Sequence, residues 1–187
     1  MKSDLKRWVE GVGERCLREV GFRKGQIVLD FGCGSGNYTI PAARTVGEEG
    51  RVYALDKDKR DLNELMQKAK SEGLENIDRM ETSGELKIDL EDKSVDVVLL
   101  YDVLHYWYFP RAKDRRAILR EVYRILRPNG LISFYPGDPE IYSNYSELKT
   151  IIREIESANF HFENEYSGTV IHENAIQKGH IMNFKKK

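Results

Sequence analysis

A glycine-rich segment between residues 28 and 39 holds the residue types best suited to binding a nucleotide. Three glycines alternate with other residues directly after a short apolar stretch, at Gly32, Gly34 and Gly36. Because glycine has no side chain, a ligand can lie close to the backbone here. Asp30 precedes the glycines, and its carboxylate suits a cationic group better than a diphosphate. The segment therefore indicates a site for a nucleotide-like ligand that carries positive charge.

A second carboxylate, Asp56, ends the next apolar stretch, 20 residues after Gly36. A carboxylate in this place accepts hydrogen bonds from ribose hydroxyls. A dinucleotide fingerprint would also need glycine at position 37, which is Asn. The residues favour a ligand with a ribose and a cationic group, and a nicotinamide dinucleotide stays open as an alternative.

Short apolar strands and amphipathic helices alternate along the middle of the chain and must position these residues. The pattern predicts strands at 27–30, 51–56, 95–100 and 130–135, and helices around 62–69, 118–126 and 148–155. Such an order predicts a parallel sheet with right-handed crossovers. Residues that follow the strands then meet at the carboxyl edge of the sheet, where ligands bind.

The two ends of the chain depart from this alternation. Residues 1–20 predict a short amphipathic helix, which we interpret as a lid. Residues 160–166 and 176–184 predict an antiparallel hairpin at one edge of the sheet, connected through Gly168 and a polar stretch. We therefore expect one domain, with an N-terminal helix or lid at 1–24, a cofactor-binding α/β core at 25–158 and a C-terminal hairpin at 159–187.

Composition and charge exclude several classes of protein. The 187 residues are 40% hydrophobic and 33% charged, and their net charge of −1 gives no electrostatic case for a nucleic-acid partner. No apolar run reaches the length of roughly 18–20 residues that a membrane-spanning helix needs, and the N-terminus has no continuous apolar core typical of a secretory signal. Two cysteines cannot form a disulfide framework or a zinc site alone. These features predict a cytoplasmic protein without a metal.

The pattern Asp30-x-Gly32-x-Gly34-x-Gly36, with Asp56 ending the next strand, resembles the class I S-adenosylmethionine-dependent methyltransferases. Residues 95–105 resemble the fourth-strand motif of their small-molecule branch, and 126–131 resemble the turn into their fifth strand. The resemblance covers about residues 20–187. It implies a Rossmann-like, seven-stranded, mostly parallel α/β sheet with helices on both faces. It also implies S-adenosylmethionine as cofactor and S-adenosylhomocysteine as product.

The resemblance also implies a set of cofactor-binding residues. Asp30 would line the methionine part of the cofactor together with Gly32 and Gly34, and Asp56 would hold the ribose with Lys57 beside the adenine. The full set is Asp30, Phe31, Gly32, Cys33, Gly34, Gly36, Asn37, Asp56, Lys57, Ser83, Gly84, Glu85, Tyr101 and Asp102.

Two parts of this set carry further expectations. Tyr101 and Asp102, at the end of the predicted fourth strand, would face the methionine amino group and the methyl-transfer axis. The loop at 83–85 would flank the adenine edge, although it lacks the acidic residue followed by a small one that the family often has.

His105 is the candidate general base, because no other histidine is expected near the catalytic edge. The alternative is a histidine packed beneath the aromatic run at 106–109. That run could itself wall an apolar pocket or contact the sulfonium through cation–π interactions, or it could pack under the N-terminal helix that carries Trp8. The hairpin histidines His161, His172 and His180 are expected to be structural or surface residues.

The expected function is methyl transfer to a small-molecule acceptor by in-line displacement, in which alignment of the reacting groups is the main catalytic task. One alternative is a methyltransferase acting on protein or RNA, which a basic groove beside the pocket would favour. That groove would comprise Arg111, Lys113, Arg115 and Arg116. Another alternative is a non-catalytic S-adenosylmethionine-binding protein. The sequence leaves the acceptor and the oligomeric state open.

Overall fold

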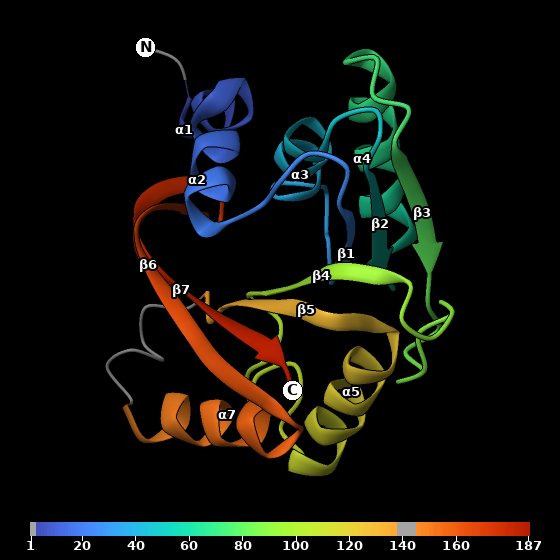
Figure 1. Cartoon of the computed structure of the whole chain (residues 1–187). Coiled ribbons are helices and arrows are strands. Elements are labelled where there is room, and N and C mark those ends of the chain that lie inside the picture. Colours follow the sequence, from blue (N-terminus) through green and yellow to red (C-terminus); the bar gives the residue numbers. More distant parts are fainter. Residues whose placement is uncertain (1–2, 138–144) are drawn as a thin grey trace.

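The computed structural model of the protein describes residues 3–137 and 145–187. It contains a seven-stranded sheet with helices on both faces (Figure 1). The N-terminal half comprises α1 (Asp4–Arg7), the π-helical turn η1 (Trp8–Val12), α2 (Gly13–Val20), β1 (Ile27–Phe31), α3 (Thr39–Val46), β2 (Arg51–Asp56), α4 (Lys59–Ser71) and β3 (Ile77–Glu81). The C-terminal half comprises β4 (Val95–Tyr101), α5 (Ala112–Ile125), β5 (Leu126–Tyr135), α7 (Tyr145–Ser157), β6 (Phe160–His172) and β7 (Ala175–Lys186).

The strand order is β3-β2-β1-β4-β5-β7-β6. Strands β1 to β5 pair in parallel, β7 runs antiparallel to β5, and β6 closes the edge antiparallel to β7. This is the Rossmann-like, mostly parallel sheet that the sequence predicts. The chain order reverses between β1 and β4, so the loops that follow these two strands diverge there. Such a switch point is where open α/β sheets bind ligands.

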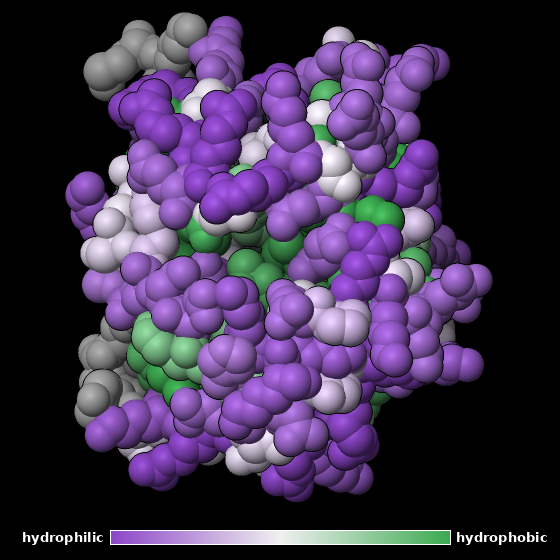
Figure 2. Space-filling model, in the orientation of Figure 1, coloured by the Kyte–Doolittle hydropathy of each residue, from purple (hydrophilic) through white to green (hydrophobic). Residues whose placement is uncertain are grey.

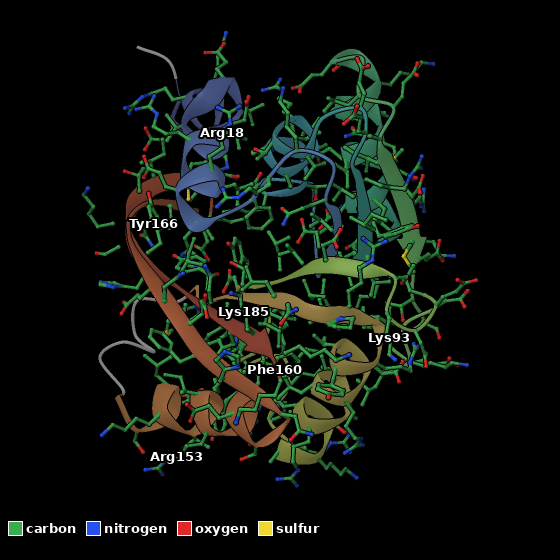
Figure 3. The ribbon with its side chains drawn as sticks, viewed as in Figure 1. Arg18, Lys93, Arg153, Phe160, Tyr166 and Lys185 are labelled. Carbon is green, nitrogen blue, oxygen red and sulfur yellow. The ribbon has the colours of Figure 1, made fainter. Side chains whose placement is uncertain are left out.

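The sheet separates two hydrophobic layers. Helices α2, α3 and α4 cover one face, and α5 and α7 cover the other (Figure 1). Each helix buries the apolar stripe that its sequence predicts, as α4 does with Leu62 and Leu65, both fully buried. Side chains fill the space between the layers, and Phe160 lies between the sheet and the helices while Arg153 points away from it (Figure 3).

The N-terminal residues form a bent helical segment instead of the single helix that the sequence predicts. Gly11 has a φ of +136°, which interrupts the helical path between α1 and α2. Trp8 is completely buried, and its indole Nε1 donates a hydrogen bond of 2.7 Å to the carbonyl oxygen of Asn37. The segment is thus tied to the loop that follows β1.

Two strand boundaries differ from the prediction. β5 already begins at Leu126, which pairs with Val95 before the register shifts. The hairpin turn lies at Glu173 and Asn174, both with positive φ, and not around Gly168, which pairs with Gly179 inside the ladder. Because β6 and β7 are longer than the predicted strands, the turn between them lies at the carboxyl edge of the sheet.

The face of the molecule that Figure 2 shows is mainly hydrophilic. Hydrophobic residues are visible in the hollow between the upper helices and the sheet, with a smaller patch over β6. Among the residues that the structure describes, no helix is both long and apolar enough to cross a membrane.

Candidate active site

A cavity of about 530 Å³ lies at the carboxyl edge of the sheet, over the switch point between β1 and β4. This volume is within the range typical of small-molecule sites. Its walls come from the loops after β1, β2, β3 and β4 and from the β6–β7 turn. The lining residues used below are Phe31, Gly32, Cys33, Gly34, Asn37, Tyr38, Asp56, Lys57, Asp58, Asp61, Gly84, Glu85, Tyr101, Asp102, Tyr108, Phe109, Ile171, His172 and Glu173.

The glycine loop meets the cavity at Gly34. This residue has a φ of +50°, and a Cβ atom built on it would have no heavy atom within 4 Å. Gly36 serves a different purpose, because a Cβ there would lie 2.3 Å from Cδ1 of Leu65 in α4. Gly34 thus leaves backbone open to a ligand, whereas Gly36 lets the loop pack against the helix layer.

Asp56 lies at the end of β2 and holds the glycine loop from below. Its Oδ2 accepts a hydrogen bond of 2.8 Å from the Gly34 N–H, and its Oδ1 accepts one of 2.9 Å from the Asp58 N–H. Each carboxylate oxygen can accept a further hydrogen bond. Two adjacent ribose hydroxyls would match these positions.

Asp30 is buried beneath the loop and is only 3% exposed. The Thr39 hydroxyl at the start of α3 donates a hydrogen bond of 2.6 Å to its Oδ2. Burial raises the pKa of Asp30 from 3.8 to about 6, although the Thr39 hydrogen bond opposes the shift and the nearby Asp56 adds to it. A cationic group brought to this end of the cavity would favour the charged carboxylate.

The cavity wall is strongly acidic. Its only Lys or Arg side chain among the described residues is Lys57, against six carboxylates, those of Asp56, Asp58, Asp61, Glu85, Asp102 and Glu173. A wall of this charge attracts a cation and repels a diphosphate. The electrostatics therefore favour a positively charged nucleoside over a nicotinamide dinucleotide.

The structure brings most of the sequence-predicted residues to this one cavity. Eleven of them line it: Phe31, Gly32, Cys33, Gly34, Asn37, Asp56, Lys57, Gly84, Glu85, Tyr101 and Asp102. Ser83 lines an adjoining depression beside Lys57. Asp30, Gly36 and His105 lie behind the wall. No described residue of 3–24 lines the cavity, so the lid stays a prediction.

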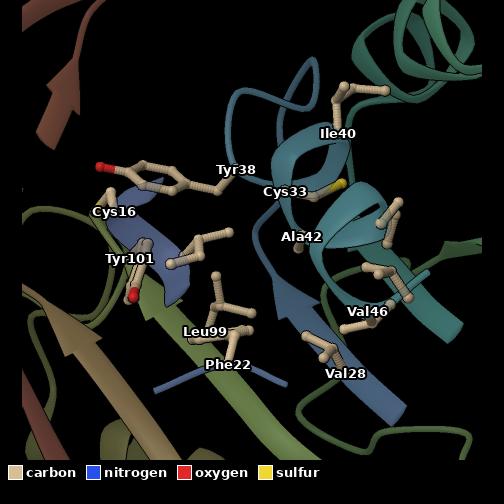
Figure 4. Packing of buried hydrophobic residues seen from close by; sticks show 14 of the residues in the cluster. Cys16, Phe22, Val28, Cys33, Tyr38, Ile40, Ala42, Val46, Leu99 and Tyr101 are labelled. Carbon is tan, nitrogen blue, oxygen red and sulfur yellow. The ribbon is translucent and has the colours of Figure 1, made fainter. Parts of the chain in front are cut away.

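Buried tyrosines form the floor of the site. Tyr38 packs edge-on against Tyr101, with ring centroids 4.6 Å apart, and both approach Cys16 of α2 (Figure 4). The hydroxyls of Tyr101 and Ser133 are hydrogen-bonded at 2.7 Å. Burial raises the pKa of both tyrosines well above 10, so they remain neutral.

Both cysteines are buried thiols. Burial raises the pKa of Cys16 to about 12. Burial, together with the charges of Asp30 and Asp56, also raises the pKa of Cys33. Neither thiol is prepared to act as a thiolate nucleophile.

The aromatic run after β4 divides between the wall and the surface. Tyr108 and Phe109 line the cavity, whereas Trp107 is 86% exposed. The alternative in which this run packs beneath the N-terminal helix is therefore wrong, since Trp8 packs instead on Tyr38. Burial and the charge of Asp102 raise the pKa of Tyr108.

Arg115 anchors this aromatic loop from α5. Its guanidinium is buried, lies 4.3 Å from the centroid of the Tyr106 ring, pairs with both carboxylate oxygens of Glu154 at 2.6 and 2.8 Å, and donates to the carbonyl of Phe109. Arg111 is engaged by Asp114. Arg115 is therefore buried and is not part of the basic groove that would favour a macromolecular substrate.

The expectation that no histidine other than His105 lies near this edge of the sheet is wrong. His172, at the end of β6, lines the cavity, and its Nε2 lies 3.1 Å from Oδ2 of Asp102. The sequence-predicted His105 lies on the other side of that carboxylate, with its Nε2 3.5 Å from Oδ1. No local signal marks His172, because the position of the hairpin turn decides where it lies. The described residues contain no group of three or more His, Cys, Asp or Glu that could hold a metal ion.

Comparison with known proteins agrees with this fold. A family model described as a methyltransferase domain matches residues 29–134. The structure is similar to that of an S-adenosylmethionine-dependent methyltransferase from Aquifex aeolicus, with a TM-score of 0.72 and 23% identity over 94% of this chain and 89% of that one. A methyltransferase from Methanosarcina mazei gives a TM-score of 0.71 at 16% identity over 91% and 96% of the two chains. Both likenesses concern the fold.

The chain belongs to the methyltransferase-domain family, and its fold is that of the class I S-adenosylmethionine-dependent methyltransferases. Among curated relatives, it is 31% identical to the demethylmenaquinone methyltransferase of Geobacillus stearothermophilus over 62% of this chain and 47% of that protein. The corresponding Staphylococcus aureus enzyme is 29% identical over 64% and 46%. The chain spans about half the length of these relatives.

Proposed function

We propose that this protein transfers a methyl group from S-adenosylmethionine to a small, planar hydroxyaromatic acceptor of the quinol type. The observation that carries the proposal is the mixed lining of the cavity, which combines carboxylates and open glycine backbone with aromatic and apolar side chains. Asp56 and the backbone of Gly34 line it, and so do Tyr108, Phe109 and Ile171. The polar groups suit a cationic nucleoside, and the aromatic and apolar side chains suit a flat ring.

The residues present fit the cofactor. Asp56 would hold the ribose hydroxyls, Lys57 and the 83–85 loop would flank the adenine, and Gly34 would lie against the methionine part. Asp30 would favour the ammonium group through charge, and Tyr101 and Asp102 would stand at the methyl-transfer axis. When bound, S-adenosylmethionine supplies an electrophilic methyl group on a positively charged sulfur. The chain's own contribution is to align the acceptor with that group and keep water out, and alignment alone can contribute about 7–11 kcal/mol.

The acceptor class is supported by the relatives as well as by the wall. The curated relatives are named for demethylmenaquinone, which in its reduced form is a planar naphthoquinol. Two hydroxyls on a flat ring system would meet the polar residues near Asp102 while the ring contacts Tyr108 and Phe109. Transfer by in-line displacement is part of this proposal.

The test is methyl transfer from radiolabelled S-adenosylmethionine to four acceptors offered in parallel. These are a short-chain demethylmenaquinol, a catechol, a primary amine such as glycine, and bulk RNA with protein. We expect label in the quinol with a kcat/KM at least tenfold above the others. Preferential labelling of the amine, the RNA or the protein would contradict the proposal. Binding of S-adenosylmethionine without transfer to any acceptor would favour a non-catalytic role.

A further inference from the structure

The Asp102 carboxylate is held in a fixed place at the end of β4. The residue has a φ of +55°, and its N–H donates a hydrogen bond of 2.8 Å to the carbonyl of Tyr135. Gly137 passes so close that a Cβ atom there would lie 1.9 Å from Oδ1 of Asp102. A left-handed backbone and a neighbour that must be glycine together aim this side chain between two imidazoles.

The two imidazoles differ in what they can do. His105 is 6% exposed, its Nδ1 accepts a hydrogen bond of 3.2 Å from the Trp107 N–H, and its Nε2 faces Asp102. Both of its nitrogens are therefore engaged, and the ring lies behind the cavity wall. His172 lines the cavity, and among the described residues Asp102 is the one polar partner of its ring, through Nε2.

The hairpin tip that carries His172 is anchored to the glycine loop. The Tyr38 hydroxyl donates to the carbonyl of Ile171 at 2.9 Å and accepts from the Ile171 N–H at 3.1 Å. One turn residue is also fixed, because Nδ2 of Asn37 donates to Oδ1 of Asn174 at 3.0 Å. These contacts fix His172 relative to the segment that is expected to hold the methyl donor.

We propose that His172 is the proton acceptor of the methyl-transfer reaction and that Asp102 is its positioning residue. With the Asp102 carboxylate against Nε2, the neutral ring carries its proton on Nε2, which leaves the Nδ1 lone pair for the acceptor. The proton of the acceptor's hydroxyl passes to Nδ1, and the electron pair released makes the ring nucleophilic. The new bond to the methyl carbon forms as the carbon–sulfur bond breaks, and the sulfur keeps that electron pair.

Where the attacking atom is a ring carbon, the ring hydrogen it carries leaves as a proton and the ring oxygen regains one, so that one proton is released overall. This assignment rests on the proposed function, because the reaction needs a base only when the acceptor must lose a proton. The other charged or titratable groups that line the cavity beside His172 and Asp102 are Glu173, Tyr38, Tyr101 and Tyr108, and His105 lies across Asp102.

The kinetic test compares three variants with short-chain demethylmenaquinol as acceptor. We expect His172→Gln to lower kcat by about 10²–10⁴-fold with the S-adenosylmethionine Kd changed less than about twofold, and to remove the fall in kcat at low pH. Asp102→Asn should also lower kcat, because the imidazole loses the carboxylate that positions it. His180→Gln, on the exposed part of β7, is the matched control. A wild-type kcat and pH profile in His172→Gln, or these effects in His105→Gln instead, would overturn the assignment.

A second measurement is independent of the acceptor. In histidine-labelled protein saturated with S-adenosylhomocysteine, nitrogen NMR should show Nδ1 of His172 unprotonated and Nε2 protonated, and Asp102→Asn should weaken this preference for one tautomer. The opposite tautomer in the wild-type protein, or the same preference in Asp102→Asn, would overturn the assignment. If the wild-type protein binds S-adenosylmethionine but leaves the quinol unmethylated, the proposed acceptor is wrong, and the tautomer still decides the pairing of His172 with Asp102.

Discussion

Oδ2 of Asp56 accepts the N–H of Gly34 at 2.8 Å, so the carboxylate that ends β2 sets the position of the loop that follows β1. These two residues belong to neighbouring parallel strands that end at the same edge. The residue expected to hold the ribose thus also shapes the backbone expected to contact the methionine part. We therefore expect ligand binding and loop conformation to be coupled through the Asp56 side chain.

Substitution of the last two loop glycines, Gly34 and Gly36, should separate ligand binding from stability. Gly36→Ala should destabilise the fold by about 2–4 kcal/mol, because it combines overpacking against Leu65 with a strained positive φ. Gly34→Ala should cost about 1–2 kcal/mol through its φ alone and yet weaken S-adenosylmethionine binding at least tenfold, because the new methyl group projects into the cavity. Denaturant unfolding and calorimetric titration measure the two effects, and equal losses of stability in both variants would contradict this account.

Asp30 should make the ligand-free protein less stable as the pH rises. Its pKa is 3.8 unfolded and about 6 folded, so the folded state binds more protons between these values and stability falls across that window. The difference corresponds to about 3 kcal/mol at neutral pH. Asp30→Asn should therefore stabilise the ligand-free protein at pH 7 and flatten its pH profile between 4 and 6. Unfolding at several pH values tests this, and a destabilised variant at pH 7 would count against it.

The buried ion pair of Arg115 and Glu154 should be worth more than an exposed one. Arg115→Met should destabilise the protein by about 3–5 kcal/mol, because it leaves the Glu154 carboxylate buried without a partner. Adding Glu154→Leu should restore much of that loss. Arg111→Met, which breaks an exposed pair with Asp114, is the control and should change stability by less than about 1 kcal/mol. If the double variant were no more stable than Arg115→Met, the pairing argument would fail.

The acidic wall should distinguish the two sulfur nucleosides by their charge. S-adenosylmethionine carries one more positive charge than S-adenosylhomocysteine, and salt screens attraction to a carboxylate-lined wall. Raising the salt concentration from 20 to 500 mM should weaken S-adenosylmethionine about three- to tenfold and S-adenosylhomocysteine less than twofold, an estimate that follows from the screening length. Titrations at both salt concentrations measure the difference. The same salt dependence for both nucleosides would show that the wall exerts no net attraction.

The parallel core could be predicted because its signals are local. The apolar strand at 95–100 and the α4 stripe with Leu62 and Leu65 both lie where their periodicity places them. The residues at the ends of β1, β2 and β4 could be assigned to one site, because parallel strands bring their carboxyl ends to one edge.

The hairpin itself was predicted, but the position of its turn could not be predicted in the same way. Glycine favours a turn locally, yet Gly168 lies opposite Gly179 in a ladder whose turn is set by Asn174, which contacts Asn37. That contact joins residues 137 positions apart, beyond any local pattern. His172 moves with the turn, and so its place opposite Asp102, 70 positions earlier, becomes apparent only in the folded chain.

The most direct test of the central claim is calorimetric titration with S-adenosylmethionine, S-adenosylhomocysteine and NAD, in wild-type protein and in Asp56→Asn. Asp78→Asn, on the exposed side of β3, is the matched control. The account predicts micromolar binding of both sulfur nucleosides and none of NAD. It also predicts a loss of at least tenfold in Asp56→Asn and no change in Asp78→Asn. Failure of the wild-type protein to bind either sulfur nucleoside, or equal binding of NAD, would contradict it.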